Sequence, residues 1–122
     1  VDKYTGTTGN DTFAAVTAAW SALDVIDGVS GTDTFTIGTT AAIAGTPAAA
    51  RVLNIDTINI SSTAAGVNAV RLNTTTDANN YTGLSALNVT TSNAAATQVL
   101  TTGAGVNVTA TGQAALSVTG GN

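Results

Sequence analysis

Short runs of alternating apolar and polar residues recur along the second half of the chain. Because successive side chains of a strand point to opposite faces, each run is expected to bury its Ile, Leu and Val and to expose its Asn, Thr and Ser. The runs are 58–61, 70–73, 87–90, 106–109 and 116–119, with 98–100 as a further strand in the widest gap. They follow each other at steps of about ten residues or nearly twice that, which is typical of a thin parallel coil. We therefore predict an all-β fold, a parallel β-solenoid of the β-roll or β-helix kind.

Two stretches interrupt this rhythm. The first has large apolar side chains spaced as on one face of a helix, at Phe13, Val16, Trp20 and Leu23. We expect an insertion at 14–23 there, either a short helix that covers the open end of the solenoid or a bulged loop. The second, 39–51, contains the only proline of the chain and is expected to be a surface loop between coils.

The composition excludes most enzyme chemistries. The chain of 122 residues has no His, Cys or Met, and its seven acidic residues are all Asp. Without imidazole or thiolate, we expect no catalytic activity, and any bound metal must be a hard cation held by oxygen. Three basic residues and a net charge of −4 argue against nucleic acid and anionic lipid as partners. We expect no membrane insertion, because no stretch has the apolar length of a membrane span.

Two octapeptides near the N-terminus match each other, "GTTGNDTF" at 6–13 and "GVSGTDTF" at 28–35. Both fit the repeat G-G-x-G-x-D-x-U-x, in which U is a large apolar residue, except that Thr7 and Val29 replace the second glycine. Glycines let a turn aim its carbonyls inward, so an Asp carboxylate and main-chain oxygens of stacked coils can together hold Ca²⁺. Shorter D-x-U copies follow from Asp24 and Asp56.

The pattern therefore predicts a calcium site built from one group of residues. The candidates are Asp11, Asp33, Gly6, Gly9, Gly28, Gly31, Asp24 and Asp27. Asp11 and Asp33 are expected to share one edge of the coil and face one ion, with Asp24 on the other edge. The competing interpretation is an Asx turn, in which an Asp accepts a hydrogen bond from its own backbone and needs no metal; for Asp24 and Asp27 the two are evenly matched.

Four segments together resemble the repeat region of RTX-type S-layer proteins and related large calcium-binding surface proteins of Gram-negative bacteria. They are "GTTGNDTF", "DVIDGVSGTDTFTI", "NIDTINIS" and "GAGVNVTATG". The resemblance implies type I secretion, an extracellular or cell-surface location, folding on calcium and self-assembly of identical subunits into a lattice or filament. It also implies a cell-surface polysaccharide as a partner of other parts of the chain. In this family Asp11 and Asp33 match the metal-ligating aspartate, and Gly6, Gly9, Gly28 and Gly31 match the turn glycines.

The predicted organisation is a single domain within a longer chain. Calcium-binding turns occupy 1–38, the surface loop follows at 39–51, and a solenoid rich in Thr, Ala and Asn continues over 52–122. Two alternatives to a surface-layer module stay open. One is an RTX adhesin segment whose outward Thr and Asn bind a surface, a glycan or ice, although the spacing of the runs predicts an uneven register. The other is the C-terminal RTX part of a secreted hydrolase.

Overall fold

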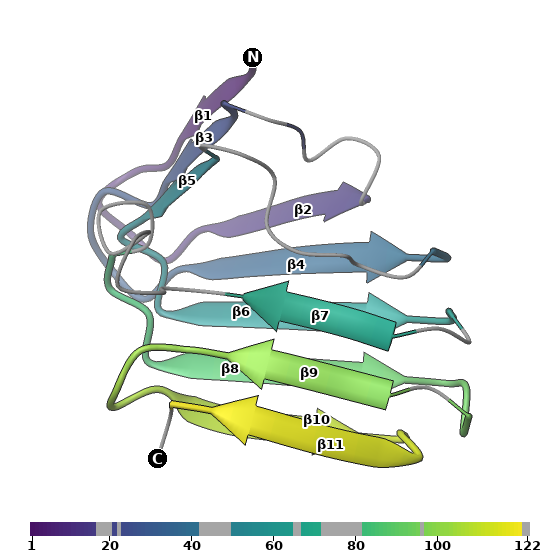
Figure 1. The fold of residues 1–122 in the computed structure, drawn as a ribbon. Coiled ribbons are helices and arrows are strands. Elements are labelled where there is room, and N and C mark those ends of the chain that lie inside the picture. Colours follow the sequence, from purple (N-terminus) through teal and green to yellow (C-terminus); the bar gives the residue numbers. More distant parts are fainter. Residues whose placement is uncertain are drawn as a thin grey trace.

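The structure, a computed structural model, consists of short parallel β-strands stacked as a solenoid (Figure 1). It describes residues 1–16, 21, 23–41, 50–64, 67–71, 82–95 and 97–120, without the side chains of 67–71, 98 and 101. Eleven strands lie in these ranges: β1 Lys3–Thr5, β2 Thr12–Val16, β3 Val25–Asp27, β4 Thr34–Thr39, β5 Arg51–Leu53, β6 Thr57–Ser62, β7 Val67–Arg71, β8 Ala86–Thr91, β9 Thr97–Thr101, β10 Asn107–Thr111 and β11 Ala115–Thr119. The prediction of an all-β parallel solenoid is confirmed.

Three parallel sheets form the walls of the coil. One five-stranded sheet, in the order β10-β8-β6-β4-β2, runs through the whole solenoid, whereas β1-β3-β5 and β11-β9-β7 form two smaller sheets. Figure 1 shows the first of the small sheets beside the upper strands of the large one and the second in front of its lower strands. The first small sheet ends with β5, directly before β6 in the chain, and the second begins with β7, directly after it, so one small sheet replaces the other at β6 while the large sheet continues unbroken.

The core is built from apolar side chains stacked in register. On the large sheet every strand contributes two inward positions, which pair directly with the same positions of the next strand. The first column is Phe13, Phe35, Ile58, Leu87 and Val108, and the second is Ala15, Ile37, Ile60, Val89 and Ala110. The middle three members of each column are almost fully buried, with 0 to 2% of their surface exposed. Alternation in the sequence thus becomes a continuous apolar column, because parallel pairing keeps like positions above one another.

Hydroxyl side chains close the corner that follows the large sheet. Thr39, Ser62 and Thr91 stand at equivalent positions at the ends of β4, β6 and β8, and all three are buried. The hydroxyl oxygen of each accepts a hydrogen bond from the backbone N–H two residues later, at 3.2, 3.1 and 3.2 Å. Such turns satisfy backbone donors where the chain leaves the sheet, so small polar residues at these corners stabilise the bend.

The two predicted interruptions need correction at their borders. The prediction of a helix in the insertion 14–23 is wrong for residues 14–16, because residues 12–16 form β2, which pairs with β4. The described part of the chain contains no helix, and 17–20 and 22 lie outside it. The loop 39–51 is shorter than predicted, since Thr39 ends β4 and Arg51 begins β5; residues 42–49 lie outside the described ranges. The described residues therefore include no helix long and apolar enough to cross a membrane.

Candidate metal centre

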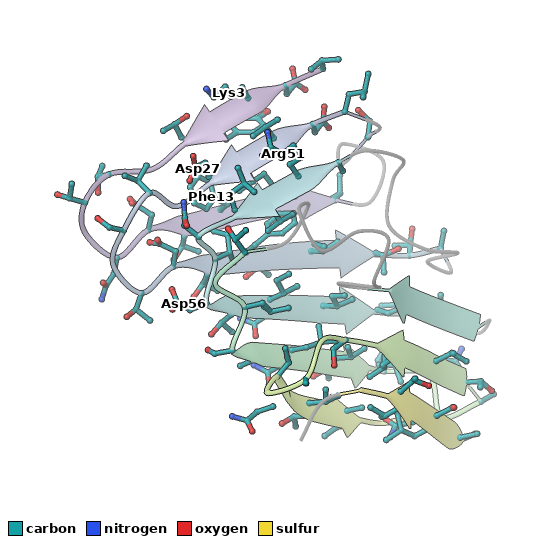
Figure 2. The ribbon with its side chains drawn as sticks, turned by 60° about the vertical axis from the view of Figure 1, so that its left-hand side comes forward. Lys3, Phe13, Asp27, Arg51 and Asp56 are labelled. Atoms are coloured by element: carbon teal, nitrogen blue, oxygen red, sulfur yellow. The ribbon has the colours of Figure 1, made fainter. Side chains whose placement is uncertain are left out.

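A row of aspartates lies directly before the strands of the large sheet. Asp11, Asp33 and Asp56 precede β2, β4 and β6 at equivalent positions, and Figure 2 labels Asp56. The backbone N–H of Asp11 donates to Oδ1 of Asp33 at 2.8 Å, and the N–H of Asp33 donates to Oδ2 of Asp56, also at 2.8 Å. Each carboxylate therefore accepts the amide of the preceding coil. The structure brings Asp11 and Asp33 together at one edge, as predicted, through a hydrogen bond that needs no metal.

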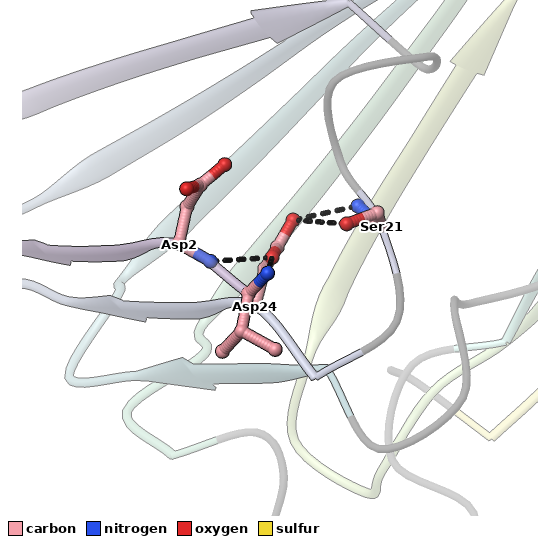
Figure 3. A network of polar contacts seen from close by, with 4 residues as sticks. Asp2, Ser21 and Asp24 are labelled. Atoms are coloured by element: carbon pink, nitrogen blue, oxygen red, sulfur yellow. Dashed lines mark hydrogen bonds and ion pairs between the residues drawn. The ribbon is translucent and has the colours of Figure 1, made fainter.

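Asp24 performs the same role in the first small sheet. It lies before β3, and its Oδ1 accepts a hydrogen bond from the backbone N–H of Asp2 at 2.8 Å. Its Oδ2 accepts two more from Ser21, from the N–H at 2.7 Å and from Oγ at 2.9 Å (Figure 3). The amino group of Val1 lies 4.0 Å from Oδ1. Only 3% of Asp24 is exposed, and its place before a different sheet keeps it apart from the Asp11–Asp33 edge.

These hydrogen bonds lower the pKa of the Asp24 carboxyl from its ordinary value of 3.8. The largest contribution comes from the backbone N–H of Asp2, followed by that of Ser21, and burial opposes them. A carboxyl whose pKa is lower in the folded than in the unfolded chain stabilises the folded state above its ordinary pKa. That contribution is lost as the pH falls through the lower, folded-state pKa, so ionised Asp24 holds the first two strands of its sheet together at neutral pH.

The glycines of the two octapeptides make room for the aspartates. A Cβ on Gly6 would stand 2.6 Å from Oδ2 of Asp11, and one on Gly28 would stand closer than 3.0 Å to both Oδ2 of Asp33 and the carbonyl oxygen of Asn54. Gly6 and Gly28 occupy equivalent places after β1 and β3, where each donates its N–H to the next strand of the small sheet. In both bends glycine and carboxylate are in close contact, but the bends differ further along, because Val29 and Gly31 have positive φ values of 73° and 124° and Thr7 and Gly9 do not.

The other two predicted glycines differ from each other. Gly31 has a φ of 124°, and a Cβ there would collide with the carbonyl oxygen of Gly9 in the preceding bend. A Cβ on Gly9 would meet only Oγ1 of Thr7, at an ordinary 3.6 Å. Gly31 is therefore required by its own conformation and by its neighbour, whereas the geometry does not demand glycine at Gly9.

One carboxylate oxygen of Asp11 and one of Asp27 each accept two hydrogen bonds. Oδ2 of Asp11 accepts from the N–H of Thr7 at 2.6 Å and from Oγ1 of Thr7 at 3.0 Å. Oδ1 of Asp27 accepts from the N–H of Val29 at 3.0 Å, which is an Asx turn, and from Nδ2 of Asn54 at 2.8 Å. For Asp27 the structure contains the turn that the competing interpretation predicts.

Asp33 differs from both, because one of its carboxylate oxygens is buried without a hydrogen-bond partner. The residue is fully buried, and no hydrogen-bond donor of the described residues reaches its Oδ2. A buried carboxylate oxygen without a partner costs about 1–3 kcal/mol or more. Oδ2 of Asp33 and the carbonyl oxygen of Asn54 both lie close against Gly28, where a Cβ would stand less than 3.0 Å from each of them. Two oxygens, one of them charged and unpaired, are ligands of the kind that a hard cation takes.

The described part of the chain contains no group of three or more acidic side chains that could hold a metal ion. A cation beside Asp33 would therefore take most of its six to eight oxygens from main-chain carbonyls and water. Among the described residues, the candidate ligands are Oδ2 of Asp33 and the carbonyl oxygen of Asn54, which lie beside Gly28. Sequence reasoning omitted Asn54 from the candidate residues. Asn54 follows β5 as Gly28 follows β3, and the register of these two strands shows that the two positions are equivalent.

No known protein family matches the chain, and no curated protein and no solved structure is significantly similar to it.

Proposed function

We propose that this chain is a structural module of a secreted bacterial surface-layer protein, stabilised by calcium outside the cell and assembled with identical subunits. The module carries no reaction. Its role is to form a stiff rod whose coils are held together by stacked apolar columns and by aspartates at the corners. Calcium links the state of the chain to its location, because Ca²⁺ is scarce in the cytoplasm and roughly millimolar outside.

The observation that carries the calcium proposal is the unpaired, fully buried Oδ2 of Asp33. Without a cation this oxygen is desolvated and uncompensated, so it destabilises the coil. When bound, a divalent ion supplies positive charge at that oxygen. Asp33 and the carbonyl of Asn54 would hold the ion, and glycine at position 28 lets both oxygens approach the same part of the backbone. Oδ1 of Asp33 continues to accept the N–H of Asp11, so ion binding requires no rearrangement of the aspartate row.

Calcium titration of the unfolding transition tests this proposal. Extracellular sites of this class bind with a Kd of about 10⁻⁴ to 10⁻³ M, so about 10 mM Ca²⁺ should raise the free energy of unfolding by about 1.4–2.7 kcal/mol. Asp33→Asn should abolish the gain. In EGTA the same variant should be at least as stable as the wild type, because its amide oxygen can still accept from Asp11 and its NH₂ group can donate to the carbonyl of Asn54.

Asp2→Asn is the matched control, since it removes the same charge from an exposed residue. It should leave the response to calcium unchanged. Equal unfolding midpoints of the wild type in calcium and in EGTA would contradict the calcium role of Asp33, and so would an Asp33→Asn variant that gains as much stability as the wild type.

A second candidate function, an adhesin segment, is favoured by one feature of the large sheet. The outward positions of β4, β6, β8 and β10 form ranks in register, and every residue is uncharged: Thr34, Thr36, Gly38, Thr57, Asn59, Ser61, Ala86, Asn88, Thr90, Asn107, Thr109 and Thr111. The uneven register expected from the sequence is therefore wrong, because the strands pair in register despite the irregular steps between the runs. Nδ2 of Asn88 donates to Oδ1 of Asn59 at 2.9 Å, so part of this face is held in a fixed arrangement.

Retention on ice and on glycan affinity supports tests the second candidate. The isolated chain should be retained, and Thr90→Lys with Thr109→Lys should abolish retention, because both positions are exposed and central to the ranks. Thr5→Lys, which adds a charge to the small sheet instead, should leave retention intact. If the wild type elutes with the void volume from both supports, this candidate is excluded.

A further inference from the structure

The bends of the two octapeptides give their aspartates different hydrogen-bond donors. In the first bend Oδ2 of Asp11 accepts the N–H of Thr7 at 2.6 Å and the hydroxyl of Thr7 at 3.0 Å. Val29 is the equivalent of Thr7 in the second bend, since both follow the opening glycine of their octapeptide. Val29 has no hydroxyl, and its N–H donates to Oδ1 of Asp27 at 3.0 Å. Among the described residues Oδ2 of Asp33 therefore has no donor, whereas the same oxygen of Asp11 has two.

A difference in the residue before each bend accounts for this. Thr5 and Asp27 pair directly as the last residues of β1 and β3, and each stands two residues before the donor position. A carboxylate there can accept the N–H two residues later in an Asx turn, and Val29 in that turn has a φ of 73°. Because a β-branched residue rarely adopts a positive φ, this conformation depends on the hydrogen bond that holds it. Thr7, which follows Thr5, has no such φ. Asp27 thus takes the donor that would otherwise be available to Asp33.

Asp27, which is labelled in Figure 2, also holds the residue that provides the second candidate ligand. Its Oδ1 accepts a hydrogen bond from Nδ2 of Asn54 at 2.8 Å, and the backbone N–H of Asn54 donates to Oγ1 of Thr82 at 2.9 Å. Asn54 is therefore fixed at its side chain and at its main chain. Its carbonyl oxygen lies against Gly28 beside Oδ2 of Asp33. In the first bend the equivalent carbonyl oxygen, beside Gly6, belongs to Gly28, which has no side chain to be held in this way.

We propose that Asp27 is the positioning residue that makes the second bend, and not the first, the calcium site. The inference rests on the proposed function, in which Asp33 holds the ion. Asp27 acts by accepting hydrogen bonds: it keeps the N–H of Val29 from Oδ2 of Asp33, and it fixes Asn54. The charge of Asp27 is not needed for this role, because the side-chain oxygen of an asparagine accepts the same hydrogen bonds. Where threonine stands at this position, local donors occupy Oδ2 of the following aspartate.

Giving the second bend the sequence of the first tests the inference. Asp27→Thr together with Val29→Thr makes residues 27–29 read Thr-Gly-Thr, as residues 5–7 do. In EGTA the ratio of folded to unfolded chain, measured by urea unfolding, should be severalfold higher for this double variant than for the wild type, because Oδ2 of Asp33 gains a donor. In about 10 mM Ca²⁺ the ratio should rise about 10- to 100-fold for the wild type and stay unchanged for the double variant. Calorimetric titration should detect calcium binding to the wild type only.

Asp27→Asn separates hydrogen bonding from charge and is the matched control. Its side-chain oxygen can accept the N–H of Val29 and Nδ2 of Asn54, so this variant should keep most of the calcium response. Loss of the response in Asp27→Asn would overturn the inference, since Asp27 would then act through its charge. If the double variant loses the circular dichroism spectrum of the wild type, Asp27→Thr alone takes its place.

The outcomes for the inference and for the proposed function are distinct. A double variant that binds calcium as the wild type does would overturn the role of Asp27 and leave the calcium role of Asp33 standing. A double variant less stable than the wild type in EGTA would also overturn it, because the donor would then not have reached Asp33. A wild type that calcium does not stabilise would refute the proposed function and this inference together.

Discussion

Leu87→Ala is expected to lower the free energy of unfolding by about 2–5 kcal/mol, the cost of truncating a fully buried aliphatic side chain. Leu87 is 0% exposed and lies between Ile58 and Val108 in the first core column. Each coil contacts only its two neighbours, so the cavity cannot be filled by side chains from elsewhere. Because net stabilities of domains are about 5–15 kcal/mol, this change should remove a large part of the total.

Urea unfolding followed by circular dichroism measures the effect. Leu23→Ala provides the control, since it is the same substitution at a side chain that is 53% exposed, and it should shift the midpoint little. A Leu87→Ala midpoint equal to that of the control would show that the stacked columns do not hold the coils together.

Gly28→Ala is expected to destabilise the fold by about 1–3 kcal/mol, the range for forcing extra atoms into a packed site. The added methyl group would collide with Oδ2 of Asp33 and with the carbonyl of Asn54, and the latter is backbone. The substitution should also abolish stabilisation by calcium, because the methyl group would push Oδ2 of Asp33 and the carbonyl of Asn54, the two proposed ligands, apart. Thermal unfolding with and without calcium measures both effects in one experiment.

Gly9→Ala is the matched control within the equivalent bend. Its methyl group would make only an ordinary contact with Oγ1 of Thr7, so stability and calcium response should stay near those of the wild type. If the two alanine variants behave alike, close contact between Gly28 and Asp33 is not what requires glycine in these bends.

Alternation of apolar and polar residues predicted the fold class correctly, because parallel stacking places each inward residue on its equivalent in the next coil. The runs 58–61, 87–90, 98–100, 106–109 and 116–119 overlap strands of the structure, whereas 70–73 overlaps β7 only at 70–71, and 72–73 lie outside the described residues. The helix was wrong over 14–16 for a related reason. Phe13 and Val16 fit a helical spacing, but in so short a segment Phe13 and Ala15 fit strand alternation equally well. Pairing of β2 with β4 decided between the two, and that long-range contact is not contained in the local pattern.

The candidate site was predictable in outline only. The octapeptides located the bends and correctly placed Asp11 and Asp33 at one edge. Which donor reaches each carboxylate oxygen depends on how far one coil is shifted over the next, and the coils are 22 residues apart here. A repeat of two nonapeptides is shorter than that. The motif does not predict the additional residues in each coil, so it predicted neither the aspartate row nor the unpaired oxygen of Asp33.

The aspartate row has a direction. The carboxylate of Asp33 accepts the N–H of Asp11, and that of Asp56 accepts the N–H of Asp33. In both hydrogen bonds the acceptor therefore lies in the later part of the polypeptide. While the solenoid folds, each of these N–H groups stays without its carboxylate partner until the following coil has packed on it. Loss of residues from the carboxyl side would strip a donor of its partner, whereas loss from the amino side would free only a carboxylate, which water solvates readily. The hydrogen bonds of the aspartate row are thus completed from the N-terminal toward the C-terminal coils, and they are lost first at the C-terminal side.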